Sequence, residues 1–216
     1  MTAQGDHVVL KCSNGDCGMR YPSPADDPRR NACPLCEAPV AQLASYTDPP
    51  LQQLPSAPGT GGSLVGVLDS IRSALNVGTM LRSADGAGLT HLYLGGLTAR
   101  ADNPKVIKTA LGAQESVPNT SGLDVVPMVE ALISQGFEVW AVDFTPRSVS
   151  LQGCIERPAK LAFVVGNERA GVDPEVLAMA HRHVHLDMHG AKTTLNVGVA
   201  FGVVAHWLRA LPSATN

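Results

Sequence analysis

Several features that would place this chain of 216 residues in a particular class are scarce or missing. It has no apolar run long enough to cross a bilayer, so we do not expect a membrane-spanning protein. Aromatic residues make up only 4% of the sequence, which argues against a surface that stacks many nucleic-acid bases. The formal net charge is only -3, so a nucleic-acid partner would have to bind a local basic patch.

The start of the chain also lacks an export signal. Residues 1–12 read MTAQGDHVVLKC, without the charged beginning and apolar middle of a secretory signal peptide. We therefore expect a cytoplasmic protein, whose thiols stay reduced. The 44% of apolar residues and 16% of charged residues fit a folded protein with a sizeable core and argue against disorder.

Four of the five cysteines lie near the N-terminus, as Cys12-x4-Cys17 and Cys33-x2-Cys36. This ligand set and spacing predicts a four-cysteine zinc ribbon in residues 1–45. The segment is too short to fold on burial alone, so bound zinc would supply the folding free energy. Two disulfides, or a redox site at the second pair, are the alternatives. Such a ribbon binds RNA or protein, or stabilises a terminus, and the sequence does not choose among these roles.

The composition changes abruptly after the ribbon. Residues 46–62 read YTDPPLQQLPSAPGTGG and are rich in proline, glycine and glutamine, which is typical of a linker. We place the domain boundary in this segment, so that residues 63–216 form the main domain.

In the main domain, apolar strands alternate with helices. Strands are expected at Leu64–Leu68, His91–Leu94, Phe137–Val142, Leu161–Val165 and His183–Leu186. Helices are expected at Asn76–Gly88, Pro104–Leu111, Leu123–Gln135 and Asp173–Ala180, with a final one from about Leu195. The alternation predicts an α/β fold with a parallel sheet. No GxGxxG pattern follows the first strand, which argues against an ordinary Rossmann dinucleotide site.

The segment from His183 to Trp207 is the most informative part of this domain. A short strand leads into a polar loop, Asp187–Thr194, and then into a helix with almost no polar face. We expect the core or another subunit to cover that helix. Asn196 lies in its first turn, where free N–H groups can hold a polar ligand. The alternative is a plain core helix with a capping asparagine.

Three separated motifs point to a known family. They are Asn76-Val77-Gly78-x3-Arg82, Gly166-Asn167-Glu168 and Met188-His189-Gly190-x4-Leu195-Asn196-Val197. In this order and spacing they resemble the SpoU/TrmH family of SPOUT RNA methyltransferases. The resemblance covers roughly Leu64 to Leu211 and leaves the cysteine module and the linker outside.

The resemblance implies a fold and an activity. The C-terminal chain would form a deep trefoil knot, a rare exception to the rule against knotted chains. The protein would be a homodimer that binds S-adenosylmethionine in the knot and shares its catalytic site across the interface. It would methylate a ribose 2′-hydroxyl in structured RNA, either tRNA or rRNA. A catalytically inactive RNA-binding protein of the same fold is the alternative.

Four side chains match the catalytic positions of that family: Arg82, Asn76, Glu168 and Asn196. The resemblance assigns Arg82 to orienting a phosphate and the hydroxyl, or to acting as a base in a strongly perturbed setting. Asn76 would support Arg82 or the RNA, and Glu168 would accept hydrogen bonds from Arg82, a backbone turn or the partner chain. Without the resemblance, each would be an ordinary surface or capping residue.

The same resemblance implies a cofactor pocket in which main-chain groups recognise the adenine. Its expected residues are Val165, Gly166, Asn167, Leu186, Met188, Thr194 and Leu195.

Three positions depart from the family pattern. Thr194 stands where serine is usual, and Asp187 stands where proline is usual. Gly198 replaces a serine or alanine and is expected to weaken its helix by roughly 1 kcal/mol. None of the three removes a proposed catalytic group, so we expect an active enzyme.

Overall fold

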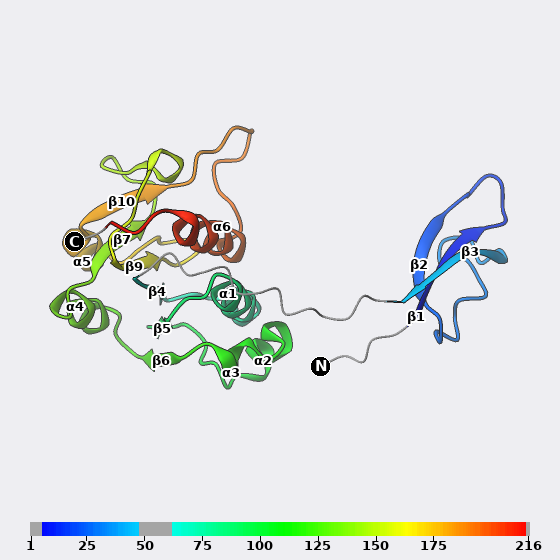
Figure 1. The fold of residues 1–216 in the computed structure, drawn as a ribbon, viewed down its shortest axis with the longest axis horizontal. Coiled ribbons are helices and arrows are strands. Elements are labelled where there is room, and N and C mark those ends of the chain that lie inside the picture. Colours follow the sequence, from blue (N-terminus) through cyan, green and yellow to red (C-terminus); the bar gives the residue numbers. More distant parts are fainter. Residues whose placement is uncertain (1–5, 48–61, 215–216) are drawn as a thin grey trace. The chain divides into compact units, whose positions relative to one another are not determined.

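The computed structural model describes residues 6–47 and 62–214, which form two compact units (Figure 1). Most of the predicted linker, residues 48–61, lies outside the described residues. Within the described ranges, no helix has both the length and the apolar character that crossing a bilayer requires.

The N-terminal unit is a three-stranded antiparallel sheet. Its strands are β1 (Asp6–Cys12), β2 (Arg20–Pro24) and β3 (Val40–Thr47), in the order β2-β1-β3. Alternation along β1 buries Val8, Leu10 and Cys12 on one face. Because β3 continues to Thr47, this sheet includes the first two residues of the predicted linker.

The main domain is built on a seven-stranded sheet in which every paired strand is parallel, in the order β6-β5-β4-β9-β7-β10-β8. The strands are β4 (Ser63–Asp69), β5 (His91–Gly95), β6 (Asn119–Gly122), β7 (Glu138–Val142), β8 (Val149–Ser150), β9 (Lys160–Val165) and β10 (Arg182–His185). The predicted α/β fold with a parallel sheet is confirmed. The two edge strands, β6 and β8, were not predicted, because they are short and lack an apolar pattern.

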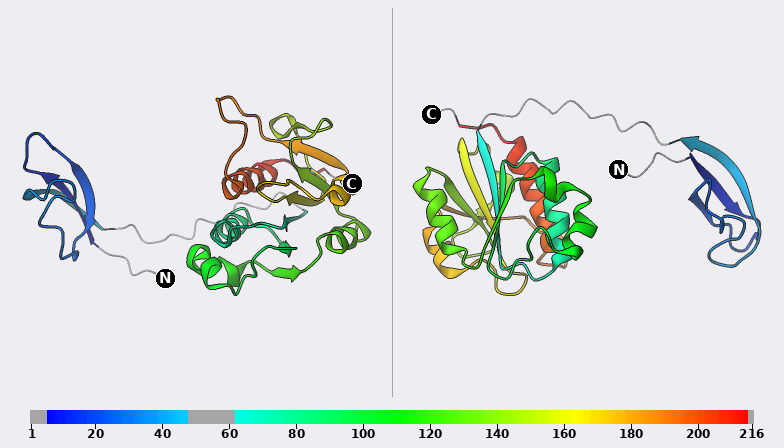
Figure 2. Two further views of the ribbon diagram at one scale, coloured as in Figure 1. Left: turned by 180° about the vertical axis from the view of Figure 1, so that it is seen from behind. Right: turned by 90° about the horizontal axis from the view of Figure 1, so that it is seen from below.

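Helices cover both faces of this sheet (Figure 2). They are α1 (Ala74–Gly86), α2 (Pro104–Ala110), α3 (Ala113–Ser116), α4 (Val126–Ser134), α5 (Pro174–Met179) and α6 (Val197–Ala210), with a short 3-10 helix, η1 (Leu151–Gly153). Buried side chains of α1, α2 and α6 pack on one face, and those of α4 and α5 pack on the other. The alternation in β9 supplies both cores, with Phe163 on the first face and Val164 on the second.

Helix α4 begins later than the sequence predicted. It was expected from Leu123, but it starts at Val126, and Leu123 is fully exposed before it. The Asp124 carboxylate accepts a hydrogen bond from the backbone N–H of Val126 at 3.0 Å. Pro127 occupies the first turn, where its missing N–H has no intrahelical partner to lose.

Helices α1 and α6 pack closely through small residues. A Cβ built on Gly198 would lie 2.8 Å from Thr79 Oγ1, and one built on Gly202 would lie 3.1 Å from Ser83 Oγ. The sequence predicted only the effect of Gly198 on helix propensity and did not predict this close contact with α1. Glycine lowers the helix propensity, but it is the residue that lets α6 approach α1 this closely.

We expected the core or another subunit to cover α6. Within the single chain, the core covers one face of this helix. Phe201, Val204, Ala205 and Leu208 are buried against the sheet and α1. A second stripe at four-residue spacing remains exposed, with Val199 at 53%, Val203 at 42% and Trp207 at 39%. An apolar stripe of this kind on a helix is unusual for a surface that faces water.

Candidate active site

A cavity of about 910 Å³ lies at the carboxyl ends of β7, β9 and β10. Three segments line it: the end of β7 with Asp143 and Phe144, the loop after β9, and the long loop from His185 to Val197. The lining includes all seven predicted cofactor residues, Val165, Gly166, Asn167, Leu186, Met188, Thr194 and Leu195, together with Glu168 and Asn196. The carboxyl edge of a parallel sheet is where α/β folds usually bind ligands.

The loop after β9 is held in a tight turn by Asn167. Its backbone exchanges two hydrogen bonds with Gly171, each at 2.9 Å, and its side-chain oxygen accepts from the N–H groups of Arg169 and Ala170. Its amide also donates to the Ser70 carbonyl at 2.7 Å. A Cβ on Gly166 would lie 2.2 Å from the Gly171 carbonyl carbon, so the turn requires glycine there.

Glu168 connects this loop to the start of α1. Its carboxylate accepts from the backbone N–H groups of Arg72 at 2.9 Å and Ser73 at 3.3 Å, and from the Asn76 side-chain amide at 3.2 Å. Partial burial raises the pKa of Glu168, but these hydrogen bonds outweigh it and hold the pKa below the ordinary glutamate value. Glu168 is therefore a carboxylate at neutral pH, and it serves here as an acceptor that fixes the Asn76 side chain.

Asn196 completes a chain of polar contacts from the other side of the cavity. It caps α6, since its side-chain oxygen accepts from the N–H groups of Gly198 at 2.9 Å and Val199 at 3.3 Å. Its amide donates to the Asn76 side-chain oxygen at 3.4 Å. Residues from all three motifs, Asn196, Asn76 and Glu168, are thus joined by direct side-chain hydrogen bonds.

Arg82 does not join this network within its own chain. It is an exposed residue near the middle of α1, and it does not line the cavity. In the described part of the chain it makes no hydrogen bond or ion pair with another side chain, including Glu168, which was one of its expected partners. Of the four predicted catalytic residues, the structure brings together three and leaves Arg82 apart.

Among the residues of the cavity wall that sequence reasoning missed, Asp143, Phe144 and His185 have defined contacts. The Asp143 carboxylate accepts from the Val172 N–H at 2.9 Å and so ties the loop after β9 to the end of β7. Phe144 is 82% exposed and lies edge-on to His185, with ring centroids 5.1 Å apart. All three lie at or just beyond the ends of β7 and β10, so their positions after predicted strands were the available signal.

Asp187, which departs from the family pattern, has specific partners. Its carboxylate accepts from Ser150 Oγ at 2.7 Å and lies 3.5 Å from His185 Nε2. Its backbone N–H, which proline would lack, donates to the Gln152 side chain at 3.3 Å. The aspartate therefore anchors the start of the long loop to the segment around η1.

The four N-terminal cysteines form a compact cluster in the first unit. Their sulfur atoms all lie within 4.8 Å of one another, with Cys12 and Cys36 at 3.4 Å and Cys17 and Cys33 at 3.8 Å. Four thiolates around one tetrahedral zinc ion, with Zn–S bonds of about 2.3 Å, would be spaced about 3.8 Å apart. A hydrogen bond from the Leu35 N–H lowers the pKa of the Cys33 thiol to about 7, whereas burial raises the pKa of Cys12 to about 12, so Cys33 is the more readily deprotonated of these two thiols.

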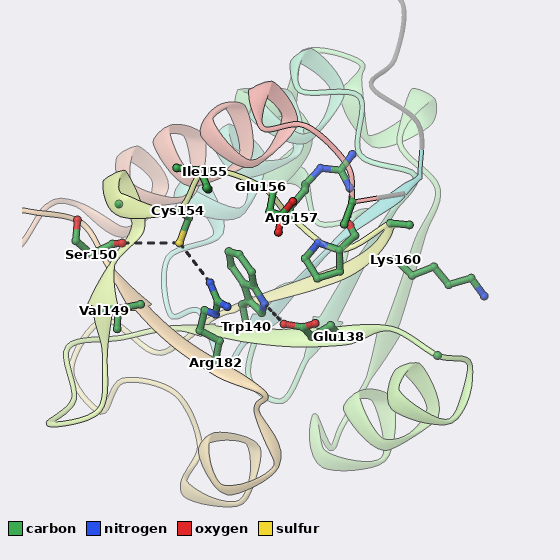
Figure 3. A pocket seen from close by; sticks show the side chains of 15 residues that line it. Glu138, Trp140, Val149, Ser150, Cys154, Ile155, Glu156, Arg157, Lys160 and Arg182 are labelled. Atoms are coloured by element: carbon green, nitrogen blue, oxygen red, sulfur yellow. Dashed lines mark hydrogen bonds between the residues drawn. The ribbon is translucent and has the colours of Figure 1, made fainter. Parts of the chain in front are cut away.

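A second cavity, of about 870 Å³, lies at the opposite, amino-terminal ends of β7, β9 and β10 (Figure 3). Arg182 stacks over Trp140 at 4.7 Å and donates to the Cys154 sulfur at 3.7 Å, and the Trp140 indole donates to Glu138 at 2.7 Å. None of the predicted site residues lines this cavity. Because Glu138, Trp140, Arg182 and Cys154 are engaged with one another, we assign these four side chains a structural role.

Comparisons with known proteins bear on the carboxyl-end cavity. The model of the SpoU rRNA Methylase family matches residues 63–206. The 23S rRNA (guanosine(2553)-2′-O)-methyltransferase RlmP of Bacillus subtilis is 30% identical over 168 residues, which cover 78% of this chain and 64% of that protein. The tRNA (guanosine(18)-2′-O)-methyltransferase of Aquifex aeolicus is 25% identical, over 66% of this chain and 67% of that protein.

Solved structures give the same result for the fold. An AdoMet-bound rRNA methyltransferase from Sinorhizobium meliloti superposes with a TM-score of 0.65 at 23% identity, over 69% of this chain and 56% of that chain. A putative RNA methyltransferase of the TrmH family from Porphyromonas gingivalis has a TM-score of 0.62 at 26% identity, over 81% and 67%. The chain thus spans less than two thirds of the length of the Bacillus relative. The family match covers most of the main domain of this chain. This chain belongs to the SpoU rRNA methylase family.

Proposed function

We propose that this protein transfers a methyl group from S-adenosylmethionine to a ribose 2′-hydroxyl of tRNA or rRNA. The observation that carries the proposal is the cavity at the carboxyl ends of β7, β9 and β10. It collects all seven predicted cofactor residues, and its wall meets the side-chain network of Asn76, Glu168 and Asn196. The names of the relatives, which act on 23S rRNA or tRNA guanosines, support the same substrate class.

The cavity fits the cofactor in size and chemistry. Its volume of about 910 Å³ lies in the range of small-molecule sites, and its wall contains both apolar residues, such as Val165 and Leu186, and polar ones. Three carboxylates line it, Asp143, Glu168 and Asp187, which suits a ligand with a sulfonium and an ammonium group. When bound, S-adenosylmethionine supplies an electrophilic methyl group.

The chain's own residues would position the hydroxyl. A ribose 2′-hydroxyl is a weak nucleophile near neutral pH, so it must be held in line and relieved of its proton. Glu168 and Asn196 fix the Asn76 amide between them, and that preorganised amide can orient RNA at the rim of the cavity. Arginine stays protonated in proteins, so we assign Arg82 to binding a phosphate and orienting the hydroxyl rather than to acting as a free base.

We also propose a homodimer, with Arg82 serving the cavity of the partner chain. Two observations support it: Arg82 lies outside the cavity of its own chain, and α6 carries an exposed apolar stripe. In a two-fold symmetric dimer the same patch of both chains forms the interface. The stripe of one chain would then be covered by the stripe of the second copy. We further propose that the long loop from His185 to Val197 and the loop after β9 form the trefoil knot of the family.

The cysteine cluster supports a structural zinc ion held by Cys12, Cys17, Cys33 and Cys36. Among the described residues of the first unit, few side chains are buried besides Val8, Leu10 and two of these cysteines, Cys12 in β1 and Cys33 outside the strands. So small a core suits a metal-dependent fold. Because a zinc thiolate site needs reduced cysteines, we place the protein in the cytoplasm.

Calorimetric titration of the full chain with S-adenosylmethionine tests the proposal. We expect saturable binding, and we expect Arg82→Ala to bind equally well, since Arg82 does not line the cavity. Gly166→Leu is the matched negative variant, because its side chain would collide with the Gly171 backbone at the cavity wall. Failure of the folded wild-type protein to bind would contradict the enzyme and favour an RNA-binding protein without catalytic activity.

A further inference from the structure

The three-stranded sheet of the N-terminal unit has two faces. One face carries the buried side chains of Val8, Leu10 and Cys12, and the proposal concerns the opposite face. Strand alternation and the registers of β1 with β2 and β3 place nine residues on it. We call this set the outer face of the ribbon; it comprises His7, Val9, Lys11, Arg20, Pro22, Pro24, Ala41, Ala44 and Tyr46. Most of these side chains are exposed, and His7 and Val9 are partly buried.

Two cations lie directly opposite each other on the outer face. Lys11 of β1 pairs in register with Arg20 of β2, and both are exposed. Within the described residues, neither side chain forms an ion pair or hydrogen bond. Like charges at directly opposed positions destabilise a sheet, so the pair needs another reason to be there. An anionic ligand that bridges the two side chains would remove the repulsion.

An aromatic pair lies farther along the same face. Tyr46 of β3 is the register partner of His7, and their rings stack at 5.4 Å with an interplanar angle of 19°. Tyr46 remains 44% exposed, so the stacked pair offers ring surface to a ligand. Between the cations and the aromatics lie the apolar side chains of Pro22, Val9 and Ala44.

The outer face also lacks negative charge. Asp6 is the only acidic residue in the three strands, and by alternation it falls on the other face, with Val8 and Leu10. The two cations lie about 13 Å from the stacked rings, at about 3.3 Å per residue along the strand. Proteins that bind single-stranded nucleic acid combine cations and exposed rings in this way. Phosphates would meet the cations, and an unpaired base would stack on the ring.

We propose that the outer face of the ribbon binds a single-stranded segment of RNA. Lys11 and Arg20 contact the backbone phosphates, and Tyr46, supported by His7, stacks on one base. The choice of RNA among polyanions rests on the proposed function, because the substrate of the main domain would be RNA. The ribbon would then bind the substrate, and these side chains would make the contacts.

Fluorescence anisotropy with a short labelled single-stranded RNA of mixed sequence tests the proposal on the full, zinc-loaded chain. Lys11→Ala/Arg20→Ala should weaken binding and reduce the slope of log K against log salt by about 1.4, at about 0.7 per phosphate contact. Tyr46→Ala should weaken binding about tenfold, and Tyr46→Phe should bind as the wild type does.

Matched variants in the same unit separate this role from general effects. Arg29→Ala/Arg30→Ala removes the same formal charge outside the sheet, from one exposed and one half-buried residue, and Leu43→Ala removes an exposed apolar side chain from β3. Both should leave RNA binding unchanged. Equal losses of RNA binding in the two double variants would overturn the proposal. Unchanged RNA binding in Lys11→Ala/Arg20→Ala would also overturn it and would favour a protein partner for this face.

Titration of the same variants with S-adenosylmethionine keeps the two proposals distinguishable. We expect Lys11→Ala/Arg20→Ala to bind the cofactor normally, because the cofactor cavity lies wholly in the main domain. A wild-type chain that binds RNA through the outer face but does not bind S-adenosylmethionine would contradict the enzyme and leave the RNA-binding face intact.

Discussion

The Asn76 side-chain amide donates to Glu168 at 3.2 Å, across 92 residues of sequence. The same asparagine accepts from Asn196, which caps the helix that closes the other side of the cavity. A single amide therefore joins the first, second and third sequence motifs. The cost of disturbing it should appear in stability as well as in activity, because Glu168 also accepts two backbone N–H groups at the start of α1.

Glu168→Gln should destabilise the fold at neutral pH, and the difference should vanish on acidification. The hydrogen bonds to Glu168 hold its folded-state pKa below the ordinary value of 4.5. Its contribution is therefore fully present above the pKa of the unfolded chain and is lost as pH falls through the lower folded value. Urea unfolding of both proteins from pH 7 downward measures this. Glu130→Gln, at an exposed position of α4, is the matched control and should leave the stability close to that of the wild type.

Gly198→Ala should destabilise the protein although alanine favours helix. The gain in propensity is about 1 kcal/mol, whereas overpacking costs about 1–3 kcal/mol. The added Cβ would lie 2.8 Å from Thr79 Oγ1, while in Gly202→Ala the nearest atom would be 3.1 Å away, so Gly202→Ala should cost less. Combining Gly198→Ala with Thr79→Ala should recover the stability in a double-mutant cycle. A single variant more stable than the wild type would show that α1 and α6 are not in close contact.

The proposed zinc site predicts one tightly bound zinc ion per chain. Cys33→Ser should lose the metal and unfold the N-terminal unit, because a core this small depends on the ion. Metal analysis and NMR spectra of the full chain measure both effects. Cys154→Ser, at a free cysteine of the main domain outside the cluster, should keep full zinc content. Stable folding of the first unit after complete removal of metal would contradict the assignment.

The exposed stripe on α6 predicts that Val203→Asp produces a monomer. Burying a new carboxylate beside its symmetry-related copy is strongly unfavourable, so the interface should dissociate. Sedimentation velocity measures the change. Leu123→Asp alters an apolar residue that is 96% exposed and lies before α4, and it should leave the association state unchanged. A wild-type chain that sediments as a monomer would remove the basis for placing Arg82 in the partner's cavity.

The sequence predicted the parts of the structure that depend on local pattern. The buried strands β4 and β9 and the helices α1 and α6 follow from apolar periodicity, and the predicted cofactor residues lie on one cavity because parallel strands end at one edge of the sheet. Thr194 and Leu195 were placed through the family resemblance, since their loop has no regular structure of its own to predict.

What the sequence did not predict depends on tertiary contact. The role of Gly198 is visible only beside Thr79, and the role of Asp187 only beside Ser150, to which no local pattern connects it. The short strand β6 consists of polar residues that pair only because β5 presents an open edge. Such features become predictable only when the neighbouring element is known.

Transfer of labelled methyl from S-adenosylmethionine to RNA, taken from cells that lack the gene, tests the central claim most directly. The labelled RNA is then hydrolysed with alkali, which cleaves beside a free 2′-hydroxyl but not beside a methylated one. We predict label in alkali-resistant dinucleotides for the wild type, and none for Arg82→Ala, which should still bind the cofactor. Label in ordinary mononucleotides would show methylation of a base, and no transfer by a protein that binds both RNA and cofactor would contradict the proposed activity.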